Sequence, residues 1–158
     1  MEIERKFLLT KMPDMPCISS HHVTQGYLSI EPEVRIRSKE PSEPLSNTFT
    51  LCIKGEGYLS REEVEVDISE EHFNTLRNMV QGQMITKQYQ KYRLPDNLVA
   101  ECSVVDSGTE HSFAYVEVEF ESEEDAISFV PPEYFGREIT YCEEYKMKRY
   151  WERTRRNG

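Results

Sequence analysis

Charged side chains recur at every second position in several short stretches of this sequence, and the stretches differ in the sign they carry. The acidic pairs are Glu2 and Glu4, Glu63 and Glu65, and Glu117 and Glu119. The basic residues are Lys6, Arg35, Arg37, Lys54, Lys87 and Lys91. Carboxylates are typical ligands of Mg²⁺ or Mn²⁺, whereas Arg and Lys bind phosphate oxygens. The combination predicts metal-assisted chemistry on a phosphorylated compound.

A spacing of two residues places each charged set on one face of a β-strand, because successive side chains point to opposite faces. The other faces are apolar, with Ile3, Ile36 and Val118 as examples. We expect these apolar faces to pack outward against helices and the charged sets to line a hydrated barrel interior, since charges inside a protein are costly unless they are paired, hydrated or used. The alternative is an open sheet with a solvated charged face, which is the commoner explanation for any single set.

The elements that must position these residues are mainly strands. Alternation predicts eight of them, near 2–9, 23–30, 33–39, 48–54, 61–68, 85–94, 98–104 and 113–121. Helices are predicted over 69–80 and 122–130, each with a serine cap and acidic residues in its first turn, and a third after Glu143. The predicted fold class is mainly β (α+β), an eight-stranded antiparallel closed β-barrel with a few flanking helices.

Length and composition narrow the functional classes. The 158 residues suit a single domain, 1–158, and the net charge of -10 disfavours nucleic acid or an anionic membrane as a partner. The four cysteines form no CxxC pair, so neither a thiolate zinc site nor a disulfide framework is expected. With no secretory leader and no apolar run of about 20 residues, we expect a cytoplasmic protein. The histidines are expected in loops or helix starts, away from the charged sets.

The first charged set, Glu2-Ile3-Glu4-Arg5-Lys6, resembles the ExExK signature of the CYTH superfamily, the triphosphate tunnel metalloenzymes. Further matching segments follow in order, and the resemblance covers essentially the whole chain. They are Arg35-Ile36-Arg37, Ile53-Lys54-Gly55, Arg61-Glu62-Glu63-Val64-Glu65 and Val116-Glu117-Val118-Glu119-Phe120. Phe135-Gly136-Arg137-Glu138-Ile139-Thr140 resembles the bacterial branch of the family.

The resemblance implies an antiparallel tunnel in which a triphosphate, inorganic triphosphate above all, is hydrolysed with Mg²⁺ or Mn²⁺. It implies that the metal is held by Glu2, Glu4, Glu117 and Glu119. The triphosphate would be held by Lys6, Arg35, Arg37, Lys54 and Lys91, with Lys87 as a further cation. Glu63 and Glu65 would orient those cations or position water. The residues expected to be catalytic are therefore Glu2, Glu4, Lys6, Glu63 and Glu65.

Three segments depart from the family pattern. Tyr89-Gln90-Lys91-Tyr92 stands where Lys-x-Arg-Tyr is usual, so that Lys87 would have to compensate. The aspartate of the next strand is expected to fall at Cys102, with Glu101 on the opposite face. Tyr145-Lys146-Met147 replaces Tyr-x-Asn, which leaves Lys146 or Lys148 as a lid over the phosphate.

Several functions share such a metal and phosphate site. An adenylyl cyclase would make cyclic AMP from ATP, and a thiamine or nucleoside triphosphatase would recognise its base at the tunnel mouth. A non-catalytic polyphosphate or nucleotide binder would bind without turnover. The sequence leaves these alternatives open, together with the oligomeric state, for which a homodimer is one possibility.

Overall fold

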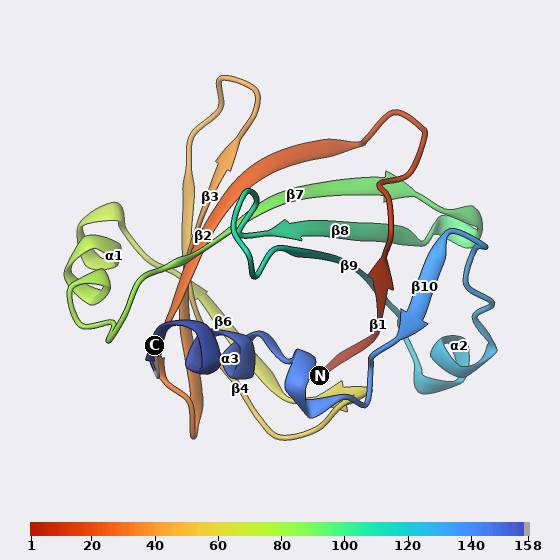
Figure 1. Cartoon of the computed structure of the whole chain (residues 1–158). Helices are drawn as coiled ribbons and strands as arrows, with labels where there is room; N and C mark the ends of the chain where they lie inside the picture. The colour runs from red at the N-terminus through yellow and green to blue at the C-terminus, as the bar shows by residue number, and fades with distance from the viewer. Residues whose placement is uncertain (157–158) are drawn as a thin grey trace.

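The chain folds into one antiparallel sheet that curls into a nearly closed barrel (Figure 1). The computed structural model describes residues 1–156. Its ten strands there are β1 (Glu2–Leu9), β2 (Ser19–Ser29), β3 (Glu33–Pro41), β4 (Thr48–Lys54), β5 (Ser60–Arg61), β6 (Glu63–Asp67), β7 (Ile85–Arg93), β8 (Val99–Val105), β9 (Phe113–Glu119) and β10 (Phe135–Glu138). The predicted barrel with flanking helices is confirmed.

The barrel closes through β5 and β6, strands of two and five residues that follow one another in the chain. The sheet runs in the order β10-β1-β9-β8-β7-β2-β3-β4-β6, and β5 pairs with β1. Arg61 of β5 lies opposite Glu2, whereas Glu63 of β6 lies opposite Lys54 of β4. One segment therefore joins the β4 side of the sheet to the β1 side.

The expected strands correspond to the observed ones with two differences. The strand predicted over 61–68 is divided into β5 and β6, because the chain leaves β1 and joins β4 at Glu62. The strand β10 was not predicted. It pairs with β1 at Phe7 and Leu9, and its four residues include a glycine and two charges, so it carries no regular alternation.

The helices begin where the capping signals place them. Helix α1 (Glu70–Arg77) starts after Ser69, whose side chain accepts the His72 N–H, and α2 (Glu123–Ser128) starts after Ser122, which accepts the Asp125 N–H. The C-terminal segment has a 3₁₀ turn at Glu143–Tyr145, helix α3 (Met147–Trp151) and a π-helical turn at Glu152–Arg156. All three expected helical regions are present, although α1 and α2 are shorter than predicted.

Two apolar clusters hold the barrel and its helices together. One covers the outer face of β1, β8 and β9 beneath α2, and includes Phe7, Val116 and Val118. Arg5 links β1 to β10 and α2. Its guanidinium donates hydrogen bonds to the Glu138 carboxylate at 2.8 Å and to the carbonyl oxygens of residues 126 and 129. The second cluster packs α3 against the barrel and includes Trp151, which lies 5.7 Å from the Tyr27 ring.

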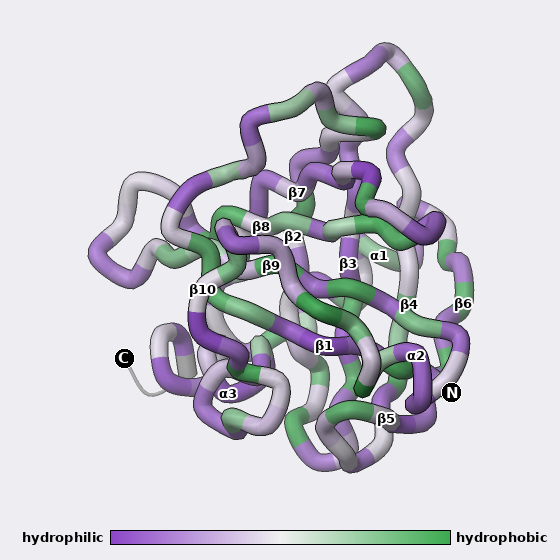
Figure 2. The backbone as a smooth tube through the Cα atoms, turned by 90° about the vertical axis from the view of Figure 1, so that its right-hand side faces the viewer, coloured by the Kyte–Doolittle hydropathy of each residue, from purple (hydrophilic) through white to green (hydrophobic). Residues whose placement is uncertain are grey.

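The outward packing of apolar residues is only partly as expected. Ile36, Val116 and Val118 are buried, but Ile53, Val64 and Val66 on β4 and β6 are 41%, 60% and 46% exposed. Helix α1 packs mainly against β3 and β4, where the Phe73 ring lies 5.2 Å from that of Phe49, and it leaves these three residues exposed. Figure 2 shows that β1 joins a hydrophilic stretch to a hydrophobic one, because the outward-facing Arg5 interrupts the alternation.

Across the described part of the chain, no helix is both long enough and apolar enough to cross a membrane.

Candidate active site in the barrel

The interior of the barrel is a polar cavity of about 460 Å³. Nine cationic and eight acidic side chains line it, although the whole protein carries a net charge of -10. Every residue predicted for the site lines this one cavity: Glu2, Glu4, Lys6, Arg35, Arg37, Lys54, Glu63, Glu65, Lys87, Lys91, Glu117 and Glu119. The open-sheet alternative is therefore wrong, whereas the individual roles of these residues stay predictions.

The acidic side of the cavity is formed by the adjacent strands β1 and β9. Glu4 lies opposite Glu119, and Lys6 lies opposite Glu117. One carboxylate oxygen from each of Glu2, Glu4 and Glu119 lies within 4.8 Å of the other two. Such a cluster of carboxylates is expensive to bury unless a cation offsets its charge.

The pKa values of these groups reflect that cost. Burial, together with the neighbouring Glu117, raises the pKa of Glu4 well above its usual range. Burial and the facing carboxylates, with Glu101 foremost, raise the pKa of Glu119 to about 7. Burial opposes ionisation of Glu117 too, but Lys6 and a hydrogen bond with Glu4 hold its pKa below the ordinary value. These closely spaced oxygen donors fit Mg²⁺ or Mn²⁺, which prefer carboxylate ligands.

The cationic side contains arginine donors that are free to bind an anion. Arg35 and Arg37 follow one another on the inner face of β3, and the Nε atom of each is buried without a hydrogen-bond partner in residues 1–156. The nearest carboxylate to Arg37 is Glu65, at 3.8 Å. A buried N–H without a partner is unfavourable, so these donors favour an anionic ligand.

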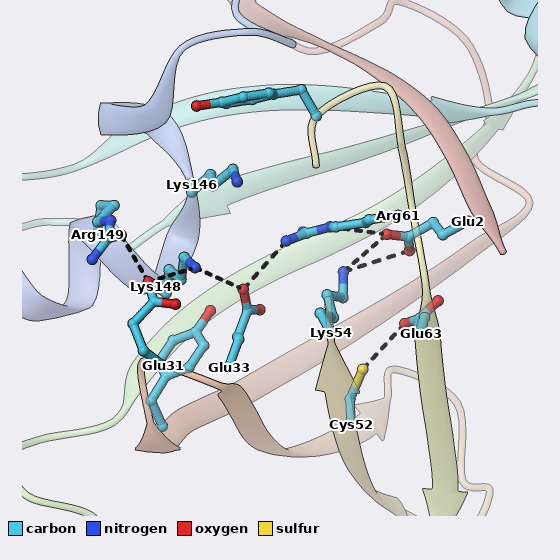
Figure 3. A network of polar contacts seen from close by, with 12 residues as sticks. Glu2, Glu31, Glu33, Cys52, Lys54, Arg61, Glu63, Lys146, Lys148 and Arg149 are labelled. Carbon is cyan, nitrogen blue, oxygen red and sulfur yellow. Dashed lines mark hydrogen bonds and ion pairs between the residues drawn. The ribbon is translucent and has the colours of Figure 1, made fainter. Parts of the chain in front are cut away.

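A charged network joins β1, β3, β4 and β5 at the point where the barrel closes (Figure 3). Lys54 lies 3.2 Å from Glu2, and Arg61 bridges Glu2 at 3.6 Å and Glu33 at 3.3 Å. Glu33 was not among the predicted site residues, and Arg61 had no assigned role. Both could have been found from the sequence, because Glu33 lies two residues before Arg35 and Arg61 lies two residues before Glu63, the spacing that places side chains on one face of a strand.

Tyr115 is a buried contact between two lysines of the cavity. The Lys6 Nζ lies 4.1 Å from the centroid of the Tyr115 ring, and the Lys87 Nζ lies 2.5 Å from its hydroxyl oxygen. Lys6 also donates to the carbonyl oxygen of Tyr145 at 2.9 Å. Burial lowers the pKa of Lys87 well below the usual value for lysine. Sequence reasoning missed Tyr115, because an aromatic residue beside an acidic pair has no distinctive pattern.

The predicted orientation of Cys102 and Glu101 is wrong. Glu101 lies on the inner face, opposite Lys91 and Glu117, and accepts a hydrogen bond from the Tyr89 hydroxyl. Cys102 is fully buried in the outer cluster with Val116. Strand β8 is therefore shifted by one residue relative to the expectation, which places an additional carboxylate in the cavity.

The two candidate lid lysines differ in position. Lys146 lines the cavity, where it forms an ion pair with Glu143 at 3.3 Å and lies 4.3 Å from the Tyr58 ring centroid. Lys148 is buried between Glu31 and Glu33, at 3.3 and 4.0 Å, and does not line the cavity. Of the two lysines only Lys146 lines the cavity, and its role as a lid stays a prediction.

Comparisons with known proteins support a phosphate-directed activity. The chain is 35% identical over 150 residues to the inorganic triphosphatase of Nitrosomonas europaea, a match that covers 93% of this chain and 94% of that protein. A crystal structure of an inorganic triphosphatase superposes with a TM-score of 0.67 at 31% identity, covering 95% of this chain and 93% of the other. No protein-family model matches the sequence.

A more distant structural neighbour is a putative adenylyl cyclase from Hippeastrum, described as having a dominant triphosphatase activity. Its TM-score is 0.52 at 14% identity, and the superposition covers 80% of this chain and 83% of the other. At this identity the likeness shows a shared fold and carries no conclusion about activity.

Proposed function

Because the chain belongs to the inorganic triphosphatase family, we propose that it hydrolyses inorganic triphosphate in the barrel cavity with Mg²⁺ or Mn²⁺ as cofactor. We also infer that this family lies within the CYTH superfamily, on the motifs that run from Glu2 to Glu119. The proposal rests on one observation above all. A single cavity combines clustered carboxylates on β1 and β9 with unpartnered arginine donors on β3.

The acidic residues of the cavity would bind the metal, and the basic residues would bind the triphosphate. Glu2, Glu4, Glu117 and Glu119 would hold the divalent ion, whose chemistry is to polarise phosphate oxygens and neutralise their charge. The triphosphate would lie against Lys6, Arg35, Arg37 and Lys54, with Lys87 and Lys91 as further cations. Fixed cations of this kind stabilise the charge that develops as a phosphoryl group is transferred.

Water, rather than a protein side chain, is the expected nucleophile. Burial raises the pKa of the Cys52 thiol to about 11 and that of Cys102 to about 12, so neither is a thiolate at neutral pH. Glu63 accepts a hydrogen bond from the Cys52 thiol at 3.2 Å and Glu65 lies beside Arg37, which suits both carboxylates to orienting cations and water. The in-line attack of water on the terminal phosphate needs no covalent intermediate.

The test is phosphate release from inorganic triphosphate, ATP and thiamine triphosphate, with Mg²⁺, with Mn²⁺ and after chelation. Glu4→Ala removes one carboxylate of the cluster, and Glu124→Ala on the exposed face of α2 is the matched control. We expect fast metal-dependent release from inorganic triphosphate that is lost in Glu4→Ala and retained in Glu124→Ala. Thermal unfolding of both variants confirms that they are folded.

Other outcomes identify the alternative functions. Cyclic AMP formed from ATP would indicate a cyclase, and faster release from ATP or thiamine triphosphate would indicate a nucleoside or thiamine triphosphatase. Binding without release from any substrate would indicate a binder and refute the proposed hydrolysis. A homodimer and a cytoplasmic location also remain predictions, which light scattering and cell fractionation test.

A further inference from the structure

A further lysine, Lys39, continues the row of cations on the inner face of β3 beyond the predicted triphosphate residues, and it lies near Lys91 of β7, which is itself one of those residues. On β3, Lys39 follows Arg35 and Arg37 at the same spacing of two, and on β7 Lys91 follows Lys87 and Tyr89. Two residues of a strand advance about 6.6 Å, so Lys39 lies about 13 Å along the strand from Arg35. Both lysines line the cavity, and Lys39 has no role in the proposed hydrolysis.

The two lysines meet around Tyr89 without a carboxylate partner of their own. The Lys39 Nζ lies 5.0 Å from the Tyr89 ring centroid, and the Lys91 Nζ lies 6.0 Å from it. In residues 1–156, neither ammonium forms an ion pair or a side-chain hydrogen bond. The Tyr89 hydroxyl is already engaged with Glu101. Both ammonium groups therefore lie within cation–π range of the same ring.

His21 adds a further basic group at this end, contrary to the expectation that the histidines lie away from the charged sets. It lies in β2 opposite Tyr89, with ring centroids 6.3 Å apart, and its Nδ1 atom is buried without a partner. The buried Nε of Arg37 is also unpartnered. Two unpartnered nitrogen atoms thus lie next to two unpaired ammonium groups.

These groups repel one another in the absence of an anion. Burial, Arg37 and Lys91 lower the pKa of Lys39 to about 8, against the smaller opposing effects of Glu101 and Glu65. Burial, Lys39 and Lys91 lower the pKa of His21 as well. The carboxylates that act on Lys39 are not those of the predicted metal cluster. A bound anion would relieve this repulsion without competing for the metal ligands.

We propose that Lys39 binds the fourth phosphate of a linear inorganic polyphosphate, at the end of the predicted triphosphate site where Arg37 and Lys91 lie. The inference rests on the proposed function for the placement of the first three phosphates. It extends the substrate class from inorganic triphosphate to longer linear polyphosphates. The row of cations from Arg35 to Lys39 supplies one continuous surface for such a chain.

The experiment measures the affinity of the full chain for tripolyphosphate, tetrapolyphosphate and ATP by calorimetry, with metal chelated so that nothing is hydrolysed. We expect the wild type to bind tetrapolyphosphate at least about tenfold more tightly than tripolyphosphate, as one more charge-assisted contact provides. Lys39→Gln should remove most of that preference, and Lys39→Arg should keep it. Lys11→Gln, at an exposed lysine, is the matched control and should leave both affinities unchanged.

Three results would overturn the subsite. They are equal wild-type affinities for the two polyphosphates, equal weakening of both by Lys39→Gln, and a loss of ATP affinity as large as that of tetrapolyphosphate. The last result would assign this end of the cavity to a nucleotide. Phosphate release from tripolyphosphate with Mg²⁺ tests the proposed function separately. A protein that fails to hydrolyse yet keeps the tetraphosphate preference refutes the function and retains the subsite.

Discussion

Arg37 is expected to stabilise the bound triphosphate but to lower the folding stability of the ligand-free protein. Its side chain is 18% exposed, its Nε has no hydrogen-bond partner in the described residues, and its one ion pair, with Glu65, is long at 3.8 Å. Burial and the neighbouring Arg35 lower its pKa, so folding disfavours the charged form. Replacing it by a side chain of similar volume and no charge should therefore separate binding from stability.

Arg37→Met is expected to weaken the binding of tripolyphosphate but not to lower the stability of the free protein. Losing one charge-assisted hydrogen bond to phosphate costs about 1.5–3 kcal/mol, which is roughly a 10- to 150-fold rise in the dissociation constant for tripolyphosphate. Replacing a whole buried ion pair by apolar side chains is often neutral or stabilising by about 1–4 kcal/mol, and we expect the same direction here because the Arg37–Glu65 pair is long and Glu65 is 39% exposed, so that water can solvate the carboxylate left behind. The free variant should therefore unfold at the same or a higher denaturant concentration than the wild type.

Calorimetry measures the dissociation constant for tripolyphosphate, and urea unfolding in phosphate-free buffer measures the free energy of unfolding. Arg93→Met, at an exposed arginine of β7, is the matched control and should change neither by more than about 0.5 kcal/mol. A variant at Arg37 that loses stability and affinity together would show that Arg37 supports the fold. An unchanged affinity would show that the phosphate does not lie against Arg37 on β3. Either result would contradict the assigned role of Arg37.

Two further predictions concern the frame around the cavity. Asp106 accepts hydrogen bonds from the Thr86 N–H at 3.0 Å, the Tyr150 hydroxyl at 2.5 Å and the Arg155 guanidinium at 2.6 Å, which hold its pKa below the ordinary value against the effect of burial. Asp106→Asn should therefore cost about 3–5 kcal/mol in urea unfolding at pH 7. A carboxylate with a lowered pKa stabilises the fold above its unfolded-state pKa, and this stabilisation is lost as the pH falls through the folded-state value. The difference in unfolding free energy between wild type and Asp106→Asn should therefore shrink near pH 3. An undiminished difference would contradict an electrostatic cause. Val64→Thr on exposed β6 should change the free energy of unfolding by no more than about 0.5 kcal/mol, whereas Val118→Thr in the outer cluster should cost about 1–3 kcal/mol, and equal costs would contradict the observed exposure.

The rows of charges and the helix starts could be predicted from local sequence patterns. The alternation of Glu2, Glu4 and Lys6, or of Arg35 and Arg37, is a local property of one strand, because the backbone alternates its side chains whatever the neighbouring strands do. The helix starts after Ser69 and Ser122 are equally local, since the capping side chain bonds a backbone N–H three residues further on. These signals were sufficient to predict twelve of the residues that line the cavity, but not Glu33, Glu101 or Tyr115.

The alignment of these rows with one another could not be predicted in this way, because it depends on how distant strands pair. Strand β8 has apolar residues on both faces, so its sequence did not show which face points into the barrel. Its register with β7 and β9 shows that Glu101 faces inward and Cys102 outward. The closure of the barrel at Arg61 and Glu63, and the meeting of Lys39 and Lys91 around Tyr89, likewise depend on strands far apart in the chain. Register and closure are non-local: they follow from pairing between distant segments, and local side-chain preferences do not encode that pairing.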